Sequence, residues 1–291
     1  MGEVKWNIME DKKMDNPNGD GYAMEDMIDS TYAATLKDSQ FIQDLIHIHD
    51  FYKHVGYNCY LFIPIGTSSF CNYDAYLFES LAGTISSIHT MVEKGHLNDA
   101  CVLLRLYFDN ILTQTYIHLL VEEKFDVFTN FYVSEVDEWL QKRNRIPSIK
   151  KILNMIETSE KTKTIYSLVN KYDRLKRDRE FLDDCVHGNR YLYFLYNCSA
   201  VHLKHRDVFL SKIQTVLKTL FVLHLSFLFS LDPHYLTASD YRDCLEMGMT
   251  PPEGSEYWIA PFVQKIFDTY IKPNSELANY LYDTCSLKIM R

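Results

Sequence analysis

Three groups of polar side chains in this sequence have the residue types and spacing that carry out chemistry. The first is an arginine and a carboxylate four residues apart, Arg105 and Asp109, inside an otherwise apolar stretch. On a helix these two side chains share one face, and pairing lowers the cost of placing both charges among apolar neighbours. The pair is interpreted either as an architectural ion pair or as an arginine that Asp109 holds in place to contact a phosphate or another anion.

The second group surrounds His187, in the run Asp183-Asp184-Cys185-Val186-His187-Gly188-Asn189. Histidine is the side chain best suited to proton transfer near neutral pH, and the glycine after it would let a substrate or a second chain approach closely. A histidine at the end of a helix is also favoured by the helix dipole without any catalytic task. His187 is therefore a candidate acid and base, with a purely structural role as the alternative.

The third group consists of His47, His49, Asp50 and His54. On a helix, His47, Asp50 and His54 lie along one face, which suits a divalent cation, and an adjacent His-Asp pair is typical of metal-dependent phosphohydrolases. Such sites need further ligands from other helices, and no pattern in the sequence supplies them. We therefore predict neither a metal nor a cofactor, and keep a phosphohydrolase as the weakest alternative.

The charges are distributed unevenly along the chain. The 291 residues carry 39 acidic and 30 basic side chains, a formal net charge of −9, which disfavours a protein coated in basic charge for indiscriminate nucleic-acid binding. Between residues 142 and 179, however, 12 Lys or Arg face only 4 Asp or Glu, and this segment leads directly to His187. Such a run usually forms a solvated helix face, but if the protein contacts RNA, the contact is expected in this segment. The candidate RNA-binding side chains are Arg143, Arg145, Lys150, Lys151, Arg174, Lys176 and Arg177.

Helix-breaking residues are rare in the sequence, so long helices are expected to position these side chains. Only 10 glycines and 8 prolines occur, and apolar residues recur at intervals of three and four, which predicts long helices and an all-α bundle. Residues 1–30 are predicted to form a mobile acidic leader, and residues 31–291 a single all-helical domain. The expected helices cover residues 32–54, 74–94, 98–124 with Asn98 as the cap, 134–145, 148–156, 165–184 and 206–231, with two more after residue 257.

Two further patterns concern location. The longest apolar run, Thr219–Leu231, is shorter than the roughly 20 residues that cross a bilayer, so a buried core helix is predicted and no membrane contact. The seven cysteines are scattered singly, which predicts reduced, mostly buried thiols in a cytoplasmic protein.

The chain resembles the HEPN superfamily of small helical domains. The resemblance rests on two segments, Leu104-Arg105-Leu106-Tyr107-Phe108-Asp109 and Asp184-Cys185-Val186-His187-Gly188, and covers a core of about residues 73–231, with extra N- and C-terminal helices. Members are typically helical domains that dimerise; many are metal-independent ribonucleases of bacterial toxin–antitoxin and antiphage systems, and others are inactive binding modules. The resemblance implies a bacterial stress or antiphage defence protein that forms a homodimer and acts on RNA or on a protein partner such as an antitoxin.

The catalytic signature of that family is an arginine followed a few residues later by histidine. Here Arg179 stands eight positions before His187, so Arg105 or an Arg179 from a second chain would supply the cation. In a metal-independent endoribonuclease, His187 would move the proton of the RNA 2′-hydroxyl, Arg105 or Arg179 would stabilise the charged phosphate, and Asp109 would orient Arg105. The alternative is a catalytically inactive helical protein for partner binding or oligomerisation, in which these residues form an internal polar network.

Overall fold

Helices form the framework of the part of the chain that the structure describes. The computed structural model describes residues 32, 36, 39–129, 131–198 and 206–291, so the predicted leader, residues 1–30, lies outside the described residues. Within those ranges the chain is mostly helical and has isolated β-bridges but no β-strand, which confirms the all-α prediction. In chain order the helices are α2 (Gln40–Cys59), α3 (Tyr73–Glu93), α4 (Leu97–Lys124), α5 (Ser134–Leu140), α6 (Ile149–Thr158), α7 (Lys163–Val169), α8 (Arg174–His187), α9 (Tyr191–Leu195), α10 (Arg206–Leu231), α11 (Asp240–Glu246), α12 (Pro261–Ile266) and α13 (Ser275–Thr284). Shorter turns lie between them: η2 (Lys171–Asp173), η3 (Pro233–Leu236), η4 (Ser255–Tyr257) and the π-helical η5 (Phe267–Ile271).

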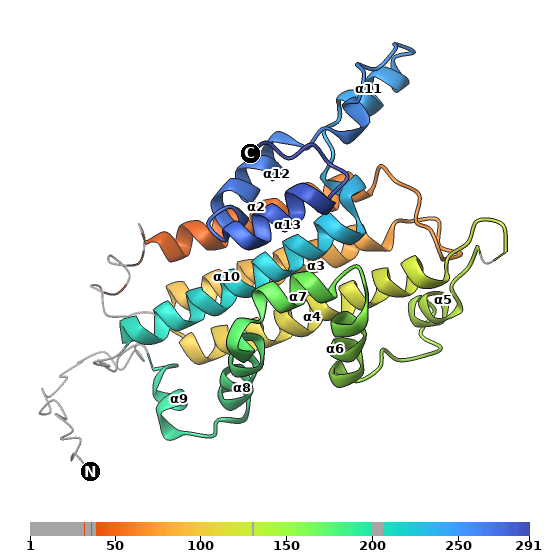
Figure 1. The fold of residues 1–291 in the computed structure, drawn as a ribbon. Coiled ribbons are helices and arrows are strands. Elements are labelled where there is room, and N and C mark those ends of the chain that lie inside the picture. The colour runs from red at the N-terminus through yellow and green to blue at the C-terminus, as the bar shows by residue number, and fades with distance from the viewer. Residues whose placement is uncertain (1–31, 33–35, 37–38, 130, 199–205) are drawn as a thin grey trace, which may run out of the picture.

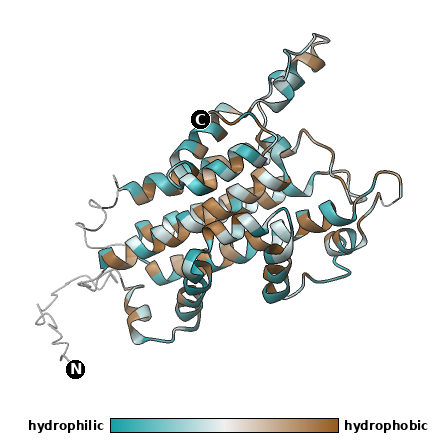
Figure 2. Ribbon diagram, in the orientation of Figure 1, coloured by the Kyte–Doolittle hydropathy of each residue, from teal (hydrophilic) through white to brown (hydrophobic). Residues whose placement is uncertain are grey.

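Helices α4 and α10 run through the centre of the molecule. Helix α4 packs against α3, α6, α8 and α10, while α12 and α13 lie on the opposite side from α6 and α8 (Figure 1). Helix α10 is long and apolar enough to cross a membrane by length and composition, yet 72% of its most apolar window is buried inside the protein, as the core-helix prediction requires. Hydrophobic residues predominate in these central helices, whereas α8 is mostly hydrophilic (Figure 2).

Local signals explain where several helices begin and end. The side chains of Ser39, Asn72 and Asn274 accept hydrogen bonds from the first-turn amides of α2, α3 and α13. Gly95 and Gly188 follow α3 and α8 with φ values of 76° and 58°, a conformation that glycine adopts without steric cost.

The cap of α4 differs from the prediction. Asn98 was expected to cap this helix, but the helix begins at Leu97, and the Asn197 side chain, which follows α9, accepts hydrogen bonds from the amides of Asn98 and Asp99 at 2.9 and 3.1 Å. A cap supplied by a residue about one hundred positions away has no local signal in the sequence. The contact fixes α9 against the start of α4.

The predicted single helix over residues 165–184 is wrong. The chain breaks between α7 and α8, where Tyr172 and Asp173 adopt left-handed backbone angles with φ values of 57° and 54°. The Asn170 side chain accepts a hydrogen bond from the amide of Leu175 at 2.9 Å and so holds the start of α8 in the new direction. In a continuous helix Tyr172 would lie on the same apolar face as Leu168 and Leu175, but here its side chain is 89% exposed.

Other helices differ from the predicted ones mainly in where they begin and end. Among the described residues α2 begins at Gln40 and continues to Cys59, α5 ends at Leu140, and α11 was not expected at all.

All seven cysteines are free thiols, but only three of them, Cys59, Cys101 and Cys185, are buried. The prediction of mostly buried thiols is therefore wrong.

Candidate functional site

Two arginines and two aspartates form a closed network of ion pairs between α4 and α8. From α4, Arg105 pairs with Asp109 and donates from Nε to Asp183 Oδ1 at 2.6 Å. From α8, Arg179 donates from Nη1 to Asp109 Oδ1 at 3.0 Å, and its Nε lies 3.8 Å from Asp183 Oδ2. Each guanidinium thus meets both carboxylates, and the network fastens α8 to the central helix.

Both arginines of this network are largely buried, and a buried cation is stabilised by pairing with a carboxylate. The side chain of Arg105 is 13% exposed and that of Arg179 is 24% exposed. Burial alone would lower the pKa of Arg105, but the adjacent Asp109 and Asp183 raise it. The sequence predicted that Asp109 pairs with Arg105; it missed Asp183, although the four-residue spacing from Arg179 to Asp183 was a usable signal.

His187 lies outside the network. It is the last residue of α8, its side chain is exposed, and it makes no hydrogen bond or ion pair with any described residue. After it, Gly188 turns the chain so tightly that a Cβ there would lie 2.9 Å from the Phe194 ring. The structure therefore brings Arg105, Asp109 and Arg179 together within one chain, but it does not bring His187 within hydrogen-bonding reach of either arginine.

The predicted RNA-binding residues divide between two hollows and the open surface. Lys150 of α6 and Arg179 of α8 line a cleft of about 390 Å³ between these helices. Arg174 and Arg177 line a larger pocket beyond α8. The remaining predicted side chains are exposed and line neither hollow: Arg143, Arg145, Lys151 and Lys176.

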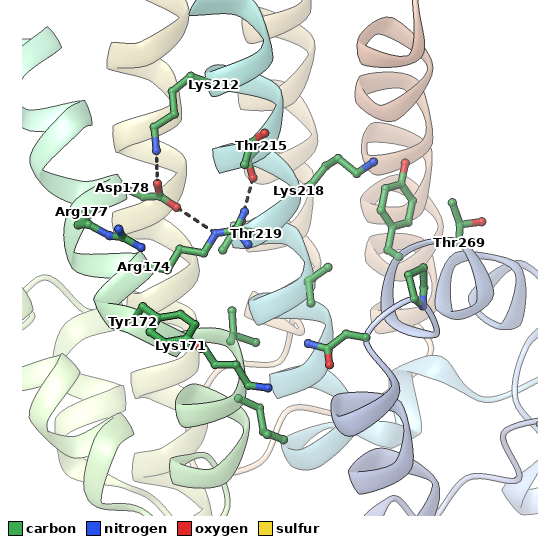
Figure 3. A pocket seen from close by; sticks show the side chains of 16 residues that line it. Lys171, Tyr172, Arg174, Arg177, Asp178, Lys212, Thr215, Lys218, Thr219 and Thr269 are labelled. Carbon is green, nitrogen blue, oxygen red and sulfur yellow. Dashed lines mark hydrogen bonds and ion pairs between the residues drawn. The ribbon is translucent and has the colours of Figure 1, made fainter. Parts of the chain in front are cut away.

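The larger pocket has a volume of about 820 Å³ and lies between α8, α10 and the segment from η5 to α13 (Figure 3). Its wall carries five cationic side chains from η2, α8 and α10, namely Lys171, Arg174, Arg177, Lys212 and Lys218. Its volume falls within the roughly 300–1,000 Å³ of ligand pockets. Lys212 and Lys218 lie far from the basic segment in the sequence, which is why charge counting along the chain missed them.

Three carboxylates position most of these cations. Asp178 accepts from Lys212 Nζ at 2.5 Å and lies 3.7 Å from Arg174 Nε (Figure 3). Asp44 of α2 lies 3.5 Å from Lys218 Nζ, and Glu276 of α13 lies 2.7 Å from Lys171 Nζ. Five cations against these three carboxylates leave an excess of two positive charges. Arg177 forms no ion pair within the part of the chain that the structure describes.

The histidine group on α2 does not form a ligand set. His54 donates from Nδ1 to the backbone oxygen of Asp50 at 2.7 Å and its ring lies 5.1 Å from that of Phe262, while His49 Nδ1 is 3.0 Å from Asp50 Oδ1. Across the described residues no three His, Cys, Asp or Glu side chains are gathered as a bound metal ion would need. The phosphohydrolase alternative thus has no assembled site in this region.

A buried polar network in the core was not predicted at all. His118 of α4 donates from Nε2 to Asp74 Oδ1 at 2.7 Å, and its Nδ1 contacts Asp232, which follows α10. Asp74 also accepts from Gln114 Nε2 at 3.1 Å and from the Tyr235 hydroxyl at 3.0 Å. These contacts connect α3, α4 and the end of α10 inside the protein.

The charges in this core network stabilise one another. Burial would lower the pKa of His118, but Asp232 and Asp74 on its two sides raise it well above the ordinary value of 6.5. Burial would raise the pKa of Asp74, but His118, Gln114 and Tyr235 hold it below 3.8. The nearby His224 remains neutral, since burial and the positive His118 lower its pKa to about 3.

In comparisons with known proteins, no protein family, no curated protein and no solved structure matches the chain.

Proposed function

We propose that this protein binds RNA through phosphate contacts on α8 and its neighbours, and that the network of Arg105, Asp109, Arg179 and Asp183 is a structural support for this surface. The observation that carries the proposal is the pocket beside α8, where five cationic side chains meet in one hollow. Lysine and arginine side chains are common ligands of phosphate groups. The rest of the chain is acidic, so RNA contacts are confined to this surface.

The cleft between α6 and α8 extends the surface to the other side of α8. Lys150 is exposed there, with Arg179 beside it. A strand crossing α8 would meet Lys150 on one side and Arg177 on the other. Contacts of this kind hold the backbone without selecting a sequence.

Binding of a short fluorescein-labelled single-stranded RNA, followed by anisotropy at several salt concentrations, tests the proposal. Lys150→Glu and Arg177→Glu are each expected to weaken binding by about 3- to 10-fold and to reduce the slope of log Kd against log salt by about 0.7 or more, since each removes a phosphate contact. The matched control is Lys288→Glu, the same change of charge at an exposed residue near the C-terminus that contacts the backbone oxygen of Gly254.

The proposal is wrong if wild-type protein does not bind RNA, or if all three variants weaken binding equally. The second result would mean that net charge, and not this surface, determines the affinity.

A second candidate function is cleavage by a HEPN-like, metal-independent endoribonuclease of a bacterial stress or antiphage defence system. It is favoured by the convergence of Arg105 and Asp109 of α4 with Arg179 of α8, the helix that ends in His187. In this reaction His187 would take the proton of a 2′-hydroxyl as its oxygen attacks the adjacent phosphorus, and an arginine would stabilise the charged phosphate. A cytoplasmic homodimer with a protein partner such as an antitoxin belongs to the same proposal.

Incubation with structured RNA in EDTA separates the two candidates. The second candidate expects cleavage that His187→Ala abolishes, because the group that moves the proton is lost. RNA that remains intact with wild-type protein, or cleavage that His187→Ala leaves unchanged, excludes His187 as the catalytic group. Binding of intact RNA together with no cleavage is the result that the first candidate expects.

A further inference from the structure

The strained turn at the start of α8 lies at the rim of the cationic pocket. Tyr172 and Asp173 both have left-handed backbone angles, a conformation that is strained for residues with a side chain. Strain of this kind persists where the surroundings fix it, and it is concentrated at ligand-binding sites. Its effect here is to place the Tyr172 ring at the pocket, 89% exposed, and not on the apolar face of a continuous helix.

The pocket offers two kinds of surface to a ligand. Arg174, Arg177 and Lys218 present charge, and Asp178, whose side chain is 3% exposed, fixes Arg174 from inside the wall. Apolar side chains from α7 and α10 line the same hollow, namely Leu168, Val169 and Val222. In Figure 3 the Tyr172 ring lies next to Lys171 and below Arg174.

A nucleotide with an unpaired base matches this combination. Its phosphate requires cations, and its base has an aromatic face that stacks on a tyrosine ring. The apolar wall from α7 and α10 suits the same flat ring system. A base within a duplex is already stacked and paired, so it could not enter a pocket of this kind without being unpaired.

We propose that the pocket binds a single unpaired nucleotide of an RNA strand, with its phosphate on Arg174 and Arg177 and its base on Tyr172, three side chains that lie on the same side of the pocket in Figure 3. This inference rests on the proposed RNA binding and specifies single-stranded RNA as its substrate class. The same chemistry would also accept a free mononucleotide, and the arms of the experiment separate these two sources.

The experiment measures binding of four probes to the full chain: single-stranded RNA, the same sequence as a duplex, AMP and inorganic phosphate. Tyr172→Ala is expected to weaken binding of single-stranded RNA by roughly 5- to 150-fold, the range that loss of one stacked base produces. Tyr172→Phe keeps the ring and is expected to bind as wild type does. Tyr191→Ala removes another exposed tyrosine, on α9 and outside the pocket, and serves as the matched control.

Each outcome decides between the two proposals. Weaker RNA binding by Tyr172→Ala, with normal binding by Tyr172→Phe and a preference for single strands, supports both. RNA binding that depends on Arg177 but is equal for single strand and duplex and unaffected by Tyr172→Ala overturns the nucleotide pocket and leaves RNA binding in place. Tyr172-dependent binding of AMP without binding of RNA supports the nucleotide pocket and overturns RNA binding. If no probe binds, or only inorganic phosphate does, both proposals fail.

Discussion

Replacement of His118 with alanine is expected to lower the free energy of unfolding by about 3–5 kcal/mol, the cost of breaking a buried ion pair from one side. Asp74 and Asp232 both contact the imidazole, and Asp74 is almost completely buried. Without His118, two carboxylates face each other across a cavity with no cation between them. Urea unfolding of wild type and variant measures the loss. If His118→Ala does not fold, His118→Gln, which keeps one hydrogen-bond donor without the charge, provides the comparison.

The control is His187→Ala, because His187 is exposed and has no partner among the described residues. Its free energy of unfolding is expected to stay close to that of wild type. A loss for His118→Ala as small as that for His187→Ala would show that the core network does not stabilise the fold.

The pH dependence of this loss provides an independent check. The native pKa of His118 lies well above 6.5, so its contribution is complete below 6.5 and is lost as the pH rises through the native pKa. The native pKa of Asp74 lies below 3.8, so its contribution is complete above 3.8 and is lost as the pH falls through the native pKa. The difference in free energy of unfolding between wild type and His118→Ala is therefore expected to be largest between pH 3.8 and 6.5 and to decrease at alkaline pH.

Much of the fold could be predicted because its long helices carry local signals. The predicted helix over residues 74–94 differs from α3 by one residue at each end, since Asn72 caps it and Gly95 ends it. The predicted helix over 206–231 ends where α10 ends, at Leu231, and Asp232 and Pro233 follow it. Glycine, proline and capping side chains act on their immediate neighbours, so they can be identified without knowing the rest of the structure.

The break at Tyr172 and Asp173 could not be predicted in this way. Neither residue is a glycine or a proline, and the apolar spacing through Tyr172 fits a continuous helix. The pocket was missed for the same reason, because it requires the break in the helix and two lysines of α10, Lys212 and Lys218, that are distant in the sequence.

The candidate site was predicted only where its members lie on one helix. The Arg105 and Asp109 pair follows from a four-residue spacing, and the structure confirms this contact. The contact of His118 with Asp232 joins residues more than one hundred positions apart, so no spacing could reveal it.

Replacement of Arg105 with alanine is expected to lower the free energy of unfolding by about 1–3 kcal/mol, since it leaves Asp109 and Asp183 with fewer partners at a partly buried contact between two helices. Arg105→Lys keeps the charge, but an ammonium group has no planar fork with which to reach both carboxylates, so an intermediate loss is expected.

Arg143→Ala, which removes an exposed arginine on the loop after α5, is the control for this measurement and is expected to unfold as wild type does. The same experiment decides the role of Arg105, because a structural arginine and a catalytic one differ in what they stabilise. If Arg105 is structural, the loss in free energy of unfolding, measured without RNA, increases in the order Arg143→Ala, Arg105→Lys, Arg105→Ala. An Arg105→Ala variant as stable as Arg143→Ala would contradict the structural role and would favour the cleavage mechanism, in which Arg105 contacts the phosphate.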